Sequence, residues 1–598
     1  MRVRRARAGA RRPRQVRGRA GRRVHEHRVP LPRGSPRAQP GRRRADHRAP
    51  ARVGLRLPHR LAVRRPQAAH GRLRLLPRDG HHPPEDHAAR PGWPARRGAA
   101  RCASRARVDV ARRDHVDLPE HRGDRPRLPQ LVGGAVSASA SELPPFGRSV
   151  PGNRWDLALA DAGSSNDGGG GTGAGAGAGA DARAGNPEPR SVSVIVVHFE
   201  QQSELDRTLA ALARQTHPAE LLEVIVVDDG SRAAPRVPPE VRLLVQEDLG
   251  FRAGAARNLG ARAATGDVLC FLDADTAPEP EYVSRMAALP CLLPEAVVAG
   301  HRKHADFAGI DTDAAVEVAG PERELEEPAW LADAYRDSRR LLDADDRSYR
   351  FVIGAVFSCT RWFFDQTGGF DEDFLGYGGE DWEWAHRAWL AGAVLAYEPA
   401  AVAWHDGPDW AGRTAADADS QVHKNDETLL LSRKIGVDGS RPRALRTAAP
   451  DVIAVLAAAP SAGAAFVCVD SLLEHLPHAS VVVPDEHHRV FGSDTRVVPA
   501  SRALPRGRVR IEIDAAVRFD RPEADTLQRA VSEVGISDLG AVRLGEHVVV
   551  RSERALRRTE RWGAAAAWRT EQRPDATVRA LPGDVSVAAH LGGWLSLD

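Results

Sequence analysis

Acidic residues follow two apolar runs of the sequence, at points where they could bind a metal ion. The run LLEVIVV leads into Asp228 and Asp229. The run DVLCFL leads into Asp273 and Asp275, which are separated by one alanine. Alternate residues at a strand end can bring both carboxylates near one divalent cation, and hard oxygen ligands suit Mg²⁺ or Mn²⁺. Since Asp, Gly and Ser also form ordinary turns, either cluster alone is weak evidence for a metal site. Two such clusters after two strands are stronger evidence.

A third acidic pair follows a glycine-rich loop. In the segment GYGGEDWEW, the glycines lead into Glu380 and Asp381, where we expect a helix to begin. Acids in the first turn of a helix can simply complement its macrodipole, so a structural role stays open. Such a carboxylate is expected to stay ionised near neutral pH, and could act as a base without a raised pKa. His405, further along, could complete a metal shell, although a lone histidine is more often structural.

Alternating strands and helices must position these side chains. Apolar runs over 191–197, 221–227 and 267–272 predict buried strands, and 203–215 and 253–264 predict helices. This alternation implies a parallel sheet. Because open α/β domains bind ligands at the carboxyl ends of parallel strands, the acidic clusters are expected at one edge of the sheet.

Taken in order, the segments VVDDGS, GAARNLGA, FLDADT and GYGGEDWEW resemble the family 2 nucleotide-sugar glycosyltransferases. The GGED part is similar to their galactosyltransferase-related branch. The resemblance implies a GT-A fold, which is a Rossmann-like α/β domain with a mostly parallel sheet. It also implies transfer of a hexose from a nucleotide sugar to a hydroxyl of a glycan or other acceptor. A UDP-sugar of the galactose or N-acetylhexosamine type is favoured.

The resemblance also implies a role for each candidate residue. Asp275 and His405 would hold Mn²⁺ or Mg²⁺. Glu380 would contact the acceptor, and Asp381 would be the general base of an inverting displacement. Tyr377 stands where that branch often has Trp, which leaves the choice of sugar open. The donor would be bound by Val197, Phe199, Asp228, Asp229, Arg257 and Asp273.

Charge is distributed unevenly along the 598 residues. Residues 1–150 carry 38 Arg, no Lys and 11 acidic residues, a net charge of 38 − 11 = +27, whereas the rest carry 47 basic and 69 acidic residues, a net charge of −22. Without hydrophobic periodicity, residues 1–162 are predicted to be disordered, and 163–190 form a glycine-rich linker. Arg without Lys is also what a wrong reading frame of GC-rich DNA would encode, so native translation of residues 1–150 stays open.

The remaining sequence predicts two folded domains. Residues 191–441 would form the GT-A domain, and 442–598 a smaller α/β domain in which we find no catalytic motif. The basic segment RTERW at 558–562 superficially resembles a motif of processive sugar polymerases, but it lies far from the acidic clusters. The uncharged run 452–469 is broken by Pro and Gly, which favours strand, turn and helix over a membrane span.

The cysteine content and the N-terminal sequence bear on the cellular compartment of the protein. Five Cys without paired spacing disfavour structural zinc and a disulfide scaffold. Together with the absence of an apolar signal-like segment, this predicts a cytoplasmic protein, with peripheral membrane association left open.

Two other functions also remain open at this stage. One is a polyanion-binding protein that uses the basic arm and has an inactive GT-A-like domain. Nucleic acid is not favoured as its partner, because the arm has few aromatic residues. The other is a sugar nucleotidyltransferase, which the GGED segment disfavours.

Overall fold

A computed structural model describes residues 143–164, 189–376, 378–408, 418–504, 506–573 and 578–592. These residues all belong to one compact unit of the chain, His121–Asp598. The predicted disorder of residues 1–142, most of the glycine-rich linker and Tyr377 lie outside the described residues.

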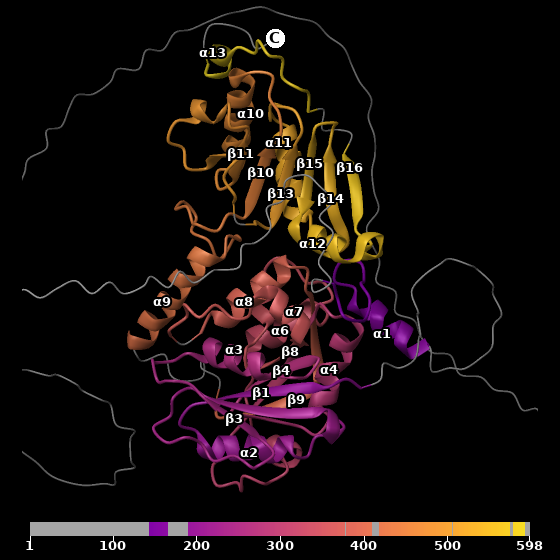
Figure 1. Cartoon of the computed structure of the whole chain (residues 1–598), viewed down its shortest axis with the longest axis vertical. Coiled ribbons are helices and arrows are strands. Elements are labelled where there is room, and N and C mark those ends of the chain that lie inside the picture. The colour runs from indigo at the N-terminus through magenta and orange to yellow at the C-terminus, as the bar shows by residue number, and fades with distance from the viewer. Residues whose placement is uncertain are drawn as a thin grey trace, which may run out of the picture. The chain divides into compact units, whose positions relative to one another are not determined.

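The first sheet is mixed, with a parallel half that matches the prediction. Its strands lie in the order β3-β2-β1-β4-β8-β6-β9-β5, and β7 pairs with β6 (Figure 1). The central strands are buried on both faces, as expected for their continuous apolar runs. The bounds are β1 Val192–His198, β2 Leu222–Asp228, β3 Arg242–Val245, β4 Val268–Asp273, β5 Thr276–Pro278, β6 Ala296–Ala305, β7 Glu324–Leu325, β8 Val356–Thr360 and β9 Val394–Asp406.

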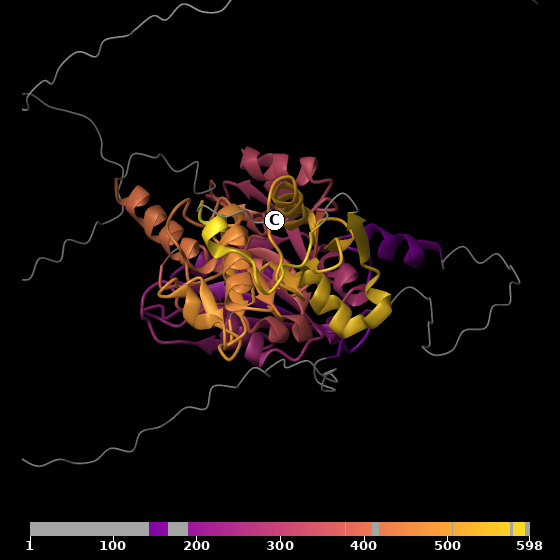
Figure 2. The ribbon, with the colours of Figure 1, turned by 90° about the horizontal axis from the view of Figure 1, so that it is seen from above.

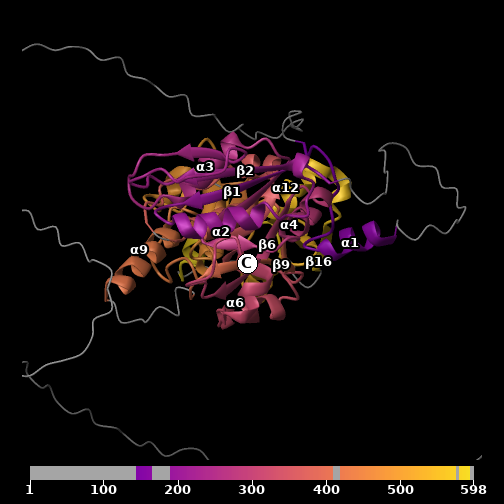
Figure 3. The same cartoon turned by 90° about the horizontal axis from the view of Figure 1, so that it is seen from below.

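Helices cover both faces of this sheet (Figure 3). α3 packs on β1 and β2, and α4 packs on β4, β6, β8 and β9. A side chain at Gly260 of α3 would place its Cβ 2.5 Å from Ile195 Cγ2, so this close helix–strand contact requires glycine. The helices are α2 Gln202–Leu212, α3 Ala253–Ala263, α4 Tyr282–Leu292, α5 Val316–Glu322, α6 Ala329–Asp337, α7 Arg361–Thr367, α8 Glu380–Leu390 and α9 Ala418–Lys434, with 3-10 turns at Ala219–Leu221 and Ser348–Phe351.

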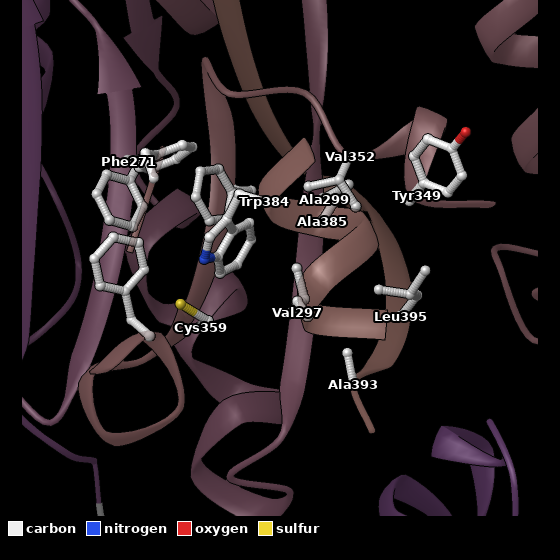
Figure 4. Packing of buried hydrophobic residues seen from close by; sticks show 14 of the residues in the cluster. Phe271, Val297, Ala299, Tyr349, Val352, Cys359, Trp384, Ala385, Ala393 and Leu395 are labelled. Atoms are coloured by element: carbon white, nitrogen blue, oxygen red, sulfur yellow. The ribbon is translucent and has the colours of Figure 1, made fainter. Parts of the chain in front are cut away.

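An aromatic cluster attaches α8 to the sheet. The rings of Phe271 in β4 and Phe357 in β8 stack with centroids 4.6 Å apart, and the Phe357 ring lies 4.9 Å from that of Trp384 in α8. All three side chains are fully buried. Figure 4 shows Trp384 beside Phe271 and Cys359, within the packed layer between helix and strands. Since Glu380 and Asp381 begin α8, this cluster fixes the helix that carries them.

The second sheet lies in residues 452–573 and has the strand order β12-β11-β10-β13-β15-β14-β16 (Figures 1 and 2, orange to yellow). The strands β12, β11, β10 and β13 are mutually parallel, whereas β15 runs antiparallel to both its neighbours. Its elements are β10 Val452–Leu456, α10 Ala462–His475, β11 Ser480–Val483, a 3-10 turn His488–Phe491, β12 Val497–Pro499, β13 Val509–Ile513, α11 Glu523–Glu533, β14 Leu539–Leu544, β15 Val548–Ser552, α12 Glu553–Trp562, a 3-10 turn Gly563–Ala566, β16 Arg569–Arg573 and α13 Val587–His590.

This arrangement confirms the predicted fold class, an α/β domain with parallel central strands followed by a smaller α/β domain. The uncharged run 452–469 is strand, turn and helix, as predicted. Within the described ranges, no helix is long and apolar enough to cross a membrane.

The predicted disorder is wrong for residues 143–162. Helix α1, Trp155–Ser164, lies in this stretch, and Asn153 before it is 2% exposed. The Asn153 amide donates hydrogen bonds to the carbonyl oxygens of Leu341 at 2.6 Å and Leu395 at 2.8 Å. The arginine-rich composition upstream concealed this short ordered segment.

The basic segment RTERW belongs to α12 and has a structural role in this fold. Arg558 and Glu295 form an ion pair at 3.6 Å, with side chains 0% and 2% exposed. Arg558 Nη1 also donates to the Gly152 carbonyl at 2.5 Å. Arg561 and Trp562 donate to Glu295 as well, at 2.5 and 3.0 Å. This segment therefore joins α12 to the first sheet and to the residues before α1.

Candidate active site

The register of the parallel strands brings the two acidic strand ends together. At the end of β1, His198 pairs with Asp228 of β2, and Val197 pairs with Asp273 of β4. Both acidic clusters therefore flank the end of one strand, about 5 Å from it on either side. This is the arrangement that the sequence predicted.

Asp228 is part of the turn itself. It is fully buried and accepts hydrogen bonds from the backbone N–H of Ser231 at 3.0 Å and from its hydroxyl at 2.6 Å. Its Oδ1 also lies 2.8 Å from Nδ1 of His198. These contacts hold the turn after β2 against the end of β1.

Asp229 holds the loop that follows β3. Its carboxylate accepts hydrogen bonds from the Gln246 side chain at 2.5 Å and from the Arg252 backbone N–H at 2.7 Å. Burial raises the pKa of Asp229 above its ordinary value, although these hydrogen bonds oppose the shift. Of the remaining donor-site candidates at this edge, Phe199 is 46% exposed and Val197 is partly buried.

The DAD turn lies beside His405. The Thr208 hydroxyl of α2 donates to the Ala274 carbonyl at 2.7 Å and so holds the turn in place. The antiparallel pairing of β5 with β9 sets Thr276 opposite His405. As a result, Asp275 Oδ2 lies 3.5 Å from His405 Nε2 and accepts a hydrogen bond from Gln201 Nε2 at 3.2 Å.

The donor set of Asp275 and His405 fits a divalent cation. His405 Nδ1 lies 3.1 Å from the Gly407 carbonyl, which can only accept, so Nδ1 carries a hydrogen and Nε2 is the nitrogen that could bind a metal. With Nε2 deprotonated, its lone pair would face the Asp275 carboxylate, and a cation bound by both atoms would satisfy them. Among the described residues there is no group of three or more His, Cys, Asp or Glu side chains that could hold a metal. Phosphate oxygens and water would therefore supply the remaining ligands.

Arg257 connects the two halves of the site. Its guanidinium donates to Asp273 Oδ1 at 2.9 Å and to Glu380 Oε1 at 2.7 Å, and its side chain is 4% exposed. Burial alone would lower the pKa of Arg257, but the charges of Asp273 and Glu380 raise it above its usual value. A permanently charged arginine thus fixes the separation between the end of β4 and the start of α8.

Asp381 lies in the first turn of α8. Its Oδ2 accepts a hydrogen bond from the Gly354 N–H at 3.0 Å, and its Oδ1 accepts one from the Trp382 N–H at 2.7 Å. Gly379, which caps the helix, has φ of +92°, a conformation that favours glycine. This explains why glycine immediately precedes the acidic pair.

The expectation that Asp381 keeps an ordinary pKa is wrong. Burial, together with the neighbouring charge of Glu380, raises the pKa of Asp381 to about 7, although hydrogen bonds from Gly354 and Trp382 and the charge of Arg257 oppose the shift. The helix terminus does not compensate for the loss of water around the carboxylate.

Sequence reasoning missed three residues that support the site. Gln201 contacts Asp275, Thr208 holds the DAD turn, and Gly354 contacts Asp381. Gln201 and Thr208 belong to the start and middle of the α2 region, and Gly354 precedes β8. Their types carry no chemical signal in the sequence, and only the tertiary fold brings them to the carboxylates.

Comparison with known families agrees with this geometry. Residues 193–316 match the family Glycosyl transferase family 2, and residues 344–400 match the N-terminal domain of galactosyltransferase. Residues 193–316 are therefore similar to glycosyltransferase family 2. The predicted resemblance is confirmed, and both matched segments contribute to the site described above.

Two curated proteins show which enzymes the chain is similar to. Validoxylamine A glucosyltransferase of Streptomyces hygroscopicus subsp. limoneus is 34% identical over 224 residues, which are 33% of this chain and 47% of that protein. Hyaluronan synthase of Pasteurella multocida is 30% identical over 267 residues, 41% of this chain and 27% of that protein. The chain thus spans about half or less of the length of these relatives. A solved mannosyltransferase of Pyrobaculum calidifontis with GDP-Man and Mn²⁺ matches at 20% identity and a TM-score of 0.31, over 43% of this chain and 68% of that one.

Proposed function

We propose that this protein is a metal-dependent, inverting glycosyltransferase that moves a hexose from a UDP-sugar to a hydroxyl of a glycan or other acceptor. The observation that carries the proposal is the convergence of Asp275 with His405 on one side of Arg257 and of Glu380 with Asp381 on the other. The match to the galactosyltransferase domain favours a donor sugar of the galactose or N-acetylhexosamine type.

The donor side of the site would hold the nucleotide and its metal. Asp275 and His405 would bind Mn²⁺ or Mg²⁺, and Asp273 would face the ribose or the metal. When bound, the cation would stabilise the negative charge that develops on the departing diphosphate. Phe199, the exposed aromatic side chain after β1, would contact the base, and the loops held by Asp228 and Asp229 would shape its pocket.

The acceptor side would position and deprotonate a hydroxyl. Glu380 is 6% exposed, its Oε1 accepts from Arg257, and its Oε2 has no hydrogen-bond partner within the described part of the chain. A buried acceptor without a partner is costly, so Oε2 would accept a hydroxyl of the bound sugar. Asp381 would take the proton from the attacking hydroxyl, since a pKa of about 7 suits a base at neutral pH.

A single displacement would invert the anomeric carbon. The attacking hydroxyl and the leaving diphosphate lie on opposite faces of the sugar, and no side chain is needed as a nucleophile. Arg257 would act as a positioning residue, because it touches one carboxylate of the donor side and one of the acceptor side.

A donor and acceptor screen with the full chain tests this function. UDP-galactose, UDP-N-acetylgalactosamine, UDP-glucose, UDP-glucuronic acid and GDP-mannose are each incubated with mixed glycans in Mn²⁺ or in EDTA. We expect metal-dependent release of UDP and a product whose anomeric proton coupling in NMR shows inversion. Retention would remove Asp381 as the base, and absence of metal-dependent turnover with every donor would contradict the proposal.

A further inference from the structure

A cavity of about 260 Å³ lies between α6 and the strands β6 and β9, outside the donor site. Its wall includes Tyr335, which stacks on Tyr397 with ring centroids 3.7 Å apart and an interplanar angle of 4°. Pro328 and Leu331 extend this apolar surface. The volume lies below the range of about 300–1,000 Å³ that is usual for drug-sized ligands, so the cavity suits a single small ring.

Polar groups face the same cavity. Glu327 accepts a hydrogen bond from Nε2 of His301 at 3.0 Å, and both side chains are only partly buried, at 28% and 21% exposure. Arg302, Arg336 and Arg340 also line it. A carboxylate, an imidazole and guanidinium groups beside an aromatic surface match a sugar ring, which has an apolar C–H face and a rim of hydroxyl groups.

Two series of neighbouring residues link the wall of the cavity to the proposed reaction centre. Along β6, Arg302 is two residues from His304, about 7 Å, and the His304 ring lies 4.9 Å from that of His405. Through the segment before β8, Tyr335 donates a hydrogen bond to the Phe351 carbonyl at 2.6 Å. Three residues later in that segment, Gly354 contacts Asp381.

The α6 wall of the cavity comes from sequence that neither matched family describes. The two family matches end at residue 316 and resume at residue 344. Glu327, Ala332 and Tyr335 all lie in the interval between them. This part of the chain can therefore carry a specificity of its own while the reaction centre stays common to the family.

We propose that this cavity is an acceptor subsite, which binds a sugar residue of the acceptor glycan one or more units away from the hydroxyl that is glycosylated. The proposal rests on the glycosyltransferase function argued above. The residues of α6 would then determine how long an acceptor the protein prefers. The protein would elongate a glycan chain in preference to a single sugar.

Filling the cavity tests the proposal without touching the reaction centre. Ala332 lines the cavity and is exposed, so Ala332→Trp would occupy the space while leaving the core intact. Val318→Trp adds the same ring at a position that is 60% exposed, on α5 and outside the lining, and serves as the matched control. Glu327→Gln keeps the shape of the lining and removes a charge.

The measurement is calorimetric titration of the full chain, in UDP and Mn²⁺, with hyaluronan, chondroitin, cello- and chito-oligosaccharides of two, four and six sugars. For at least one series, we expect the wild type and Val318→Trp to bind the longer members at least about tenfold more tightly than the two-sugar member. Ala332→Trp should abolish this gain, and Glu327→Gln should reduce it.

Two results would overturn the subsite. One is an Ala332→Trp variant that keeps the full gain with length, and the other is a wild type without length preference in every series. Failure of the proposed function would appear separately, in the same samples, as loss of metal-dependent UDP binding by the wild type.

Discussion

Both sheets of this protein have parallel strands in their middle, but different side chains lie at the carboxyl ends of those strands. Near the ends of β1 and β4 the first sheet gathers Asp273, Asp275 and His405, and the last two lie 3.5 Å apart. At the end of β10 and β13 the second sheet has Asp514, which pairs with His547 at 2.8 Å. A parallel sheet edge therefore permits a site, and the side chains delivered to it decide whether one exists.

The chain itself also covers the second edge. The Leu581 N–H donates to the Ala516 carbonyl at 2.8 Å, and Ala580 bridges to Val517. A Cβ on Gly463, at the start of α10, would lie 3.3 Å from Val587. The segment 578–592 therefore lies where a ligand would enter a doubly wound sheet.

The second region instead contributes to the position of helix α8. Arg554 of α12 lies over the Trp389 ring of α8, with its guanidinium carbon 3.7 Å from the ring centroid, and donates to the Ala393 carbonyl at 2.8 Å. Arg561 contacts the Ala391 carbonyl at the end of the same helix. Cations at the end of α8 complement its dipole, so the C-terminal region stabilises the helix that begins with Glu380 and Asp381.

Asp381→Asn is expected to give the largest effect on the first region. An amide cannot accept the proton of the attacking hydroxyl, so kcat should fall by about 10³-fold or more while UDP binding stays close to that of the wild type. Steady-state kinetics and calorimetry measure the two quantities. Wild-type turnover in this variant would transfer the role of base to Glu380.

Arg558→Met should affect stability and leave the chemistry almost unchanged. Removing this arginine leaves Glu295 buried with fewer partners, so the free energy of unfolding should fall by about 3 kcal/mol. Urea unfolding followed by circular dichroism measures the loss, and UDP affinity at low temperature is the control. If the variant kept its stability but lost UDP affinity, Arg558 would serve nucleotide binding and not the stability of the fold.

Asp275→Asn should weaken Mn²⁺-dependent UDP binding by about 10- to 100-fold, because one of the two protein ligands loses its charge. Asp514→Asn makes the same substitution at the corresponding edge of the second sheet, where the side chain is 68% exposed. It should leave UDP binding unchanged. If both substitutions weakened UDP binding equally, the nucleotide site could not be assigned to the edge of the first sheet.

The pH dependence of kcat should show a smaller effect. Because Asp381 must be deprotonated to act as base and its pKa is about 7, kcat should fall about tenfold per pH unit below neutrality and level off above it. Glu380→Gln removes the neighbouring charge that raises this pKa, so the acidic limb should move to lower pH. A limb that stays in place would show that Glu380 does not act on the base electrostatically.

The sequence predicted the parts of the site that rest on local patterns. Asp228 and Asp273 follow continuous apolar runs, and such runs identify parallel strands and their ends. The position of His405 in the sequence suggested a metal ligand only weakly, and the family resemblance strengthened that prediction. The pairing of β5 with β9 explains how His405 comes to lie beside Asp275. The fold of the central strands could be predicted for the same reason.

The remaining features depend on long-range packing. Gln201 and Gly354 reach the carboxylates through the tertiary fold, and the raised pKa of Asp381 reflects burial that composition does not reveal. The order of residues 143–162 arises from contacts such as those of Asn153 with Leu395, 242 positions away. Contacts of this kind leave no periodic pattern in the sequence.

Calorimetric titration of the full chain with UDP, in Mn²⁺ and in EDTA, tests the central claim most directly. We expect saturable binding in Mn²⁺ that is at least about tenfold weaker in EDTA, and no comparable binding of ADP. Equal affinity with and without metal, or no binding by a chain that circular dichroism shows to be folded, would contradict a nucleotide-sugar site at Asp275 and His405.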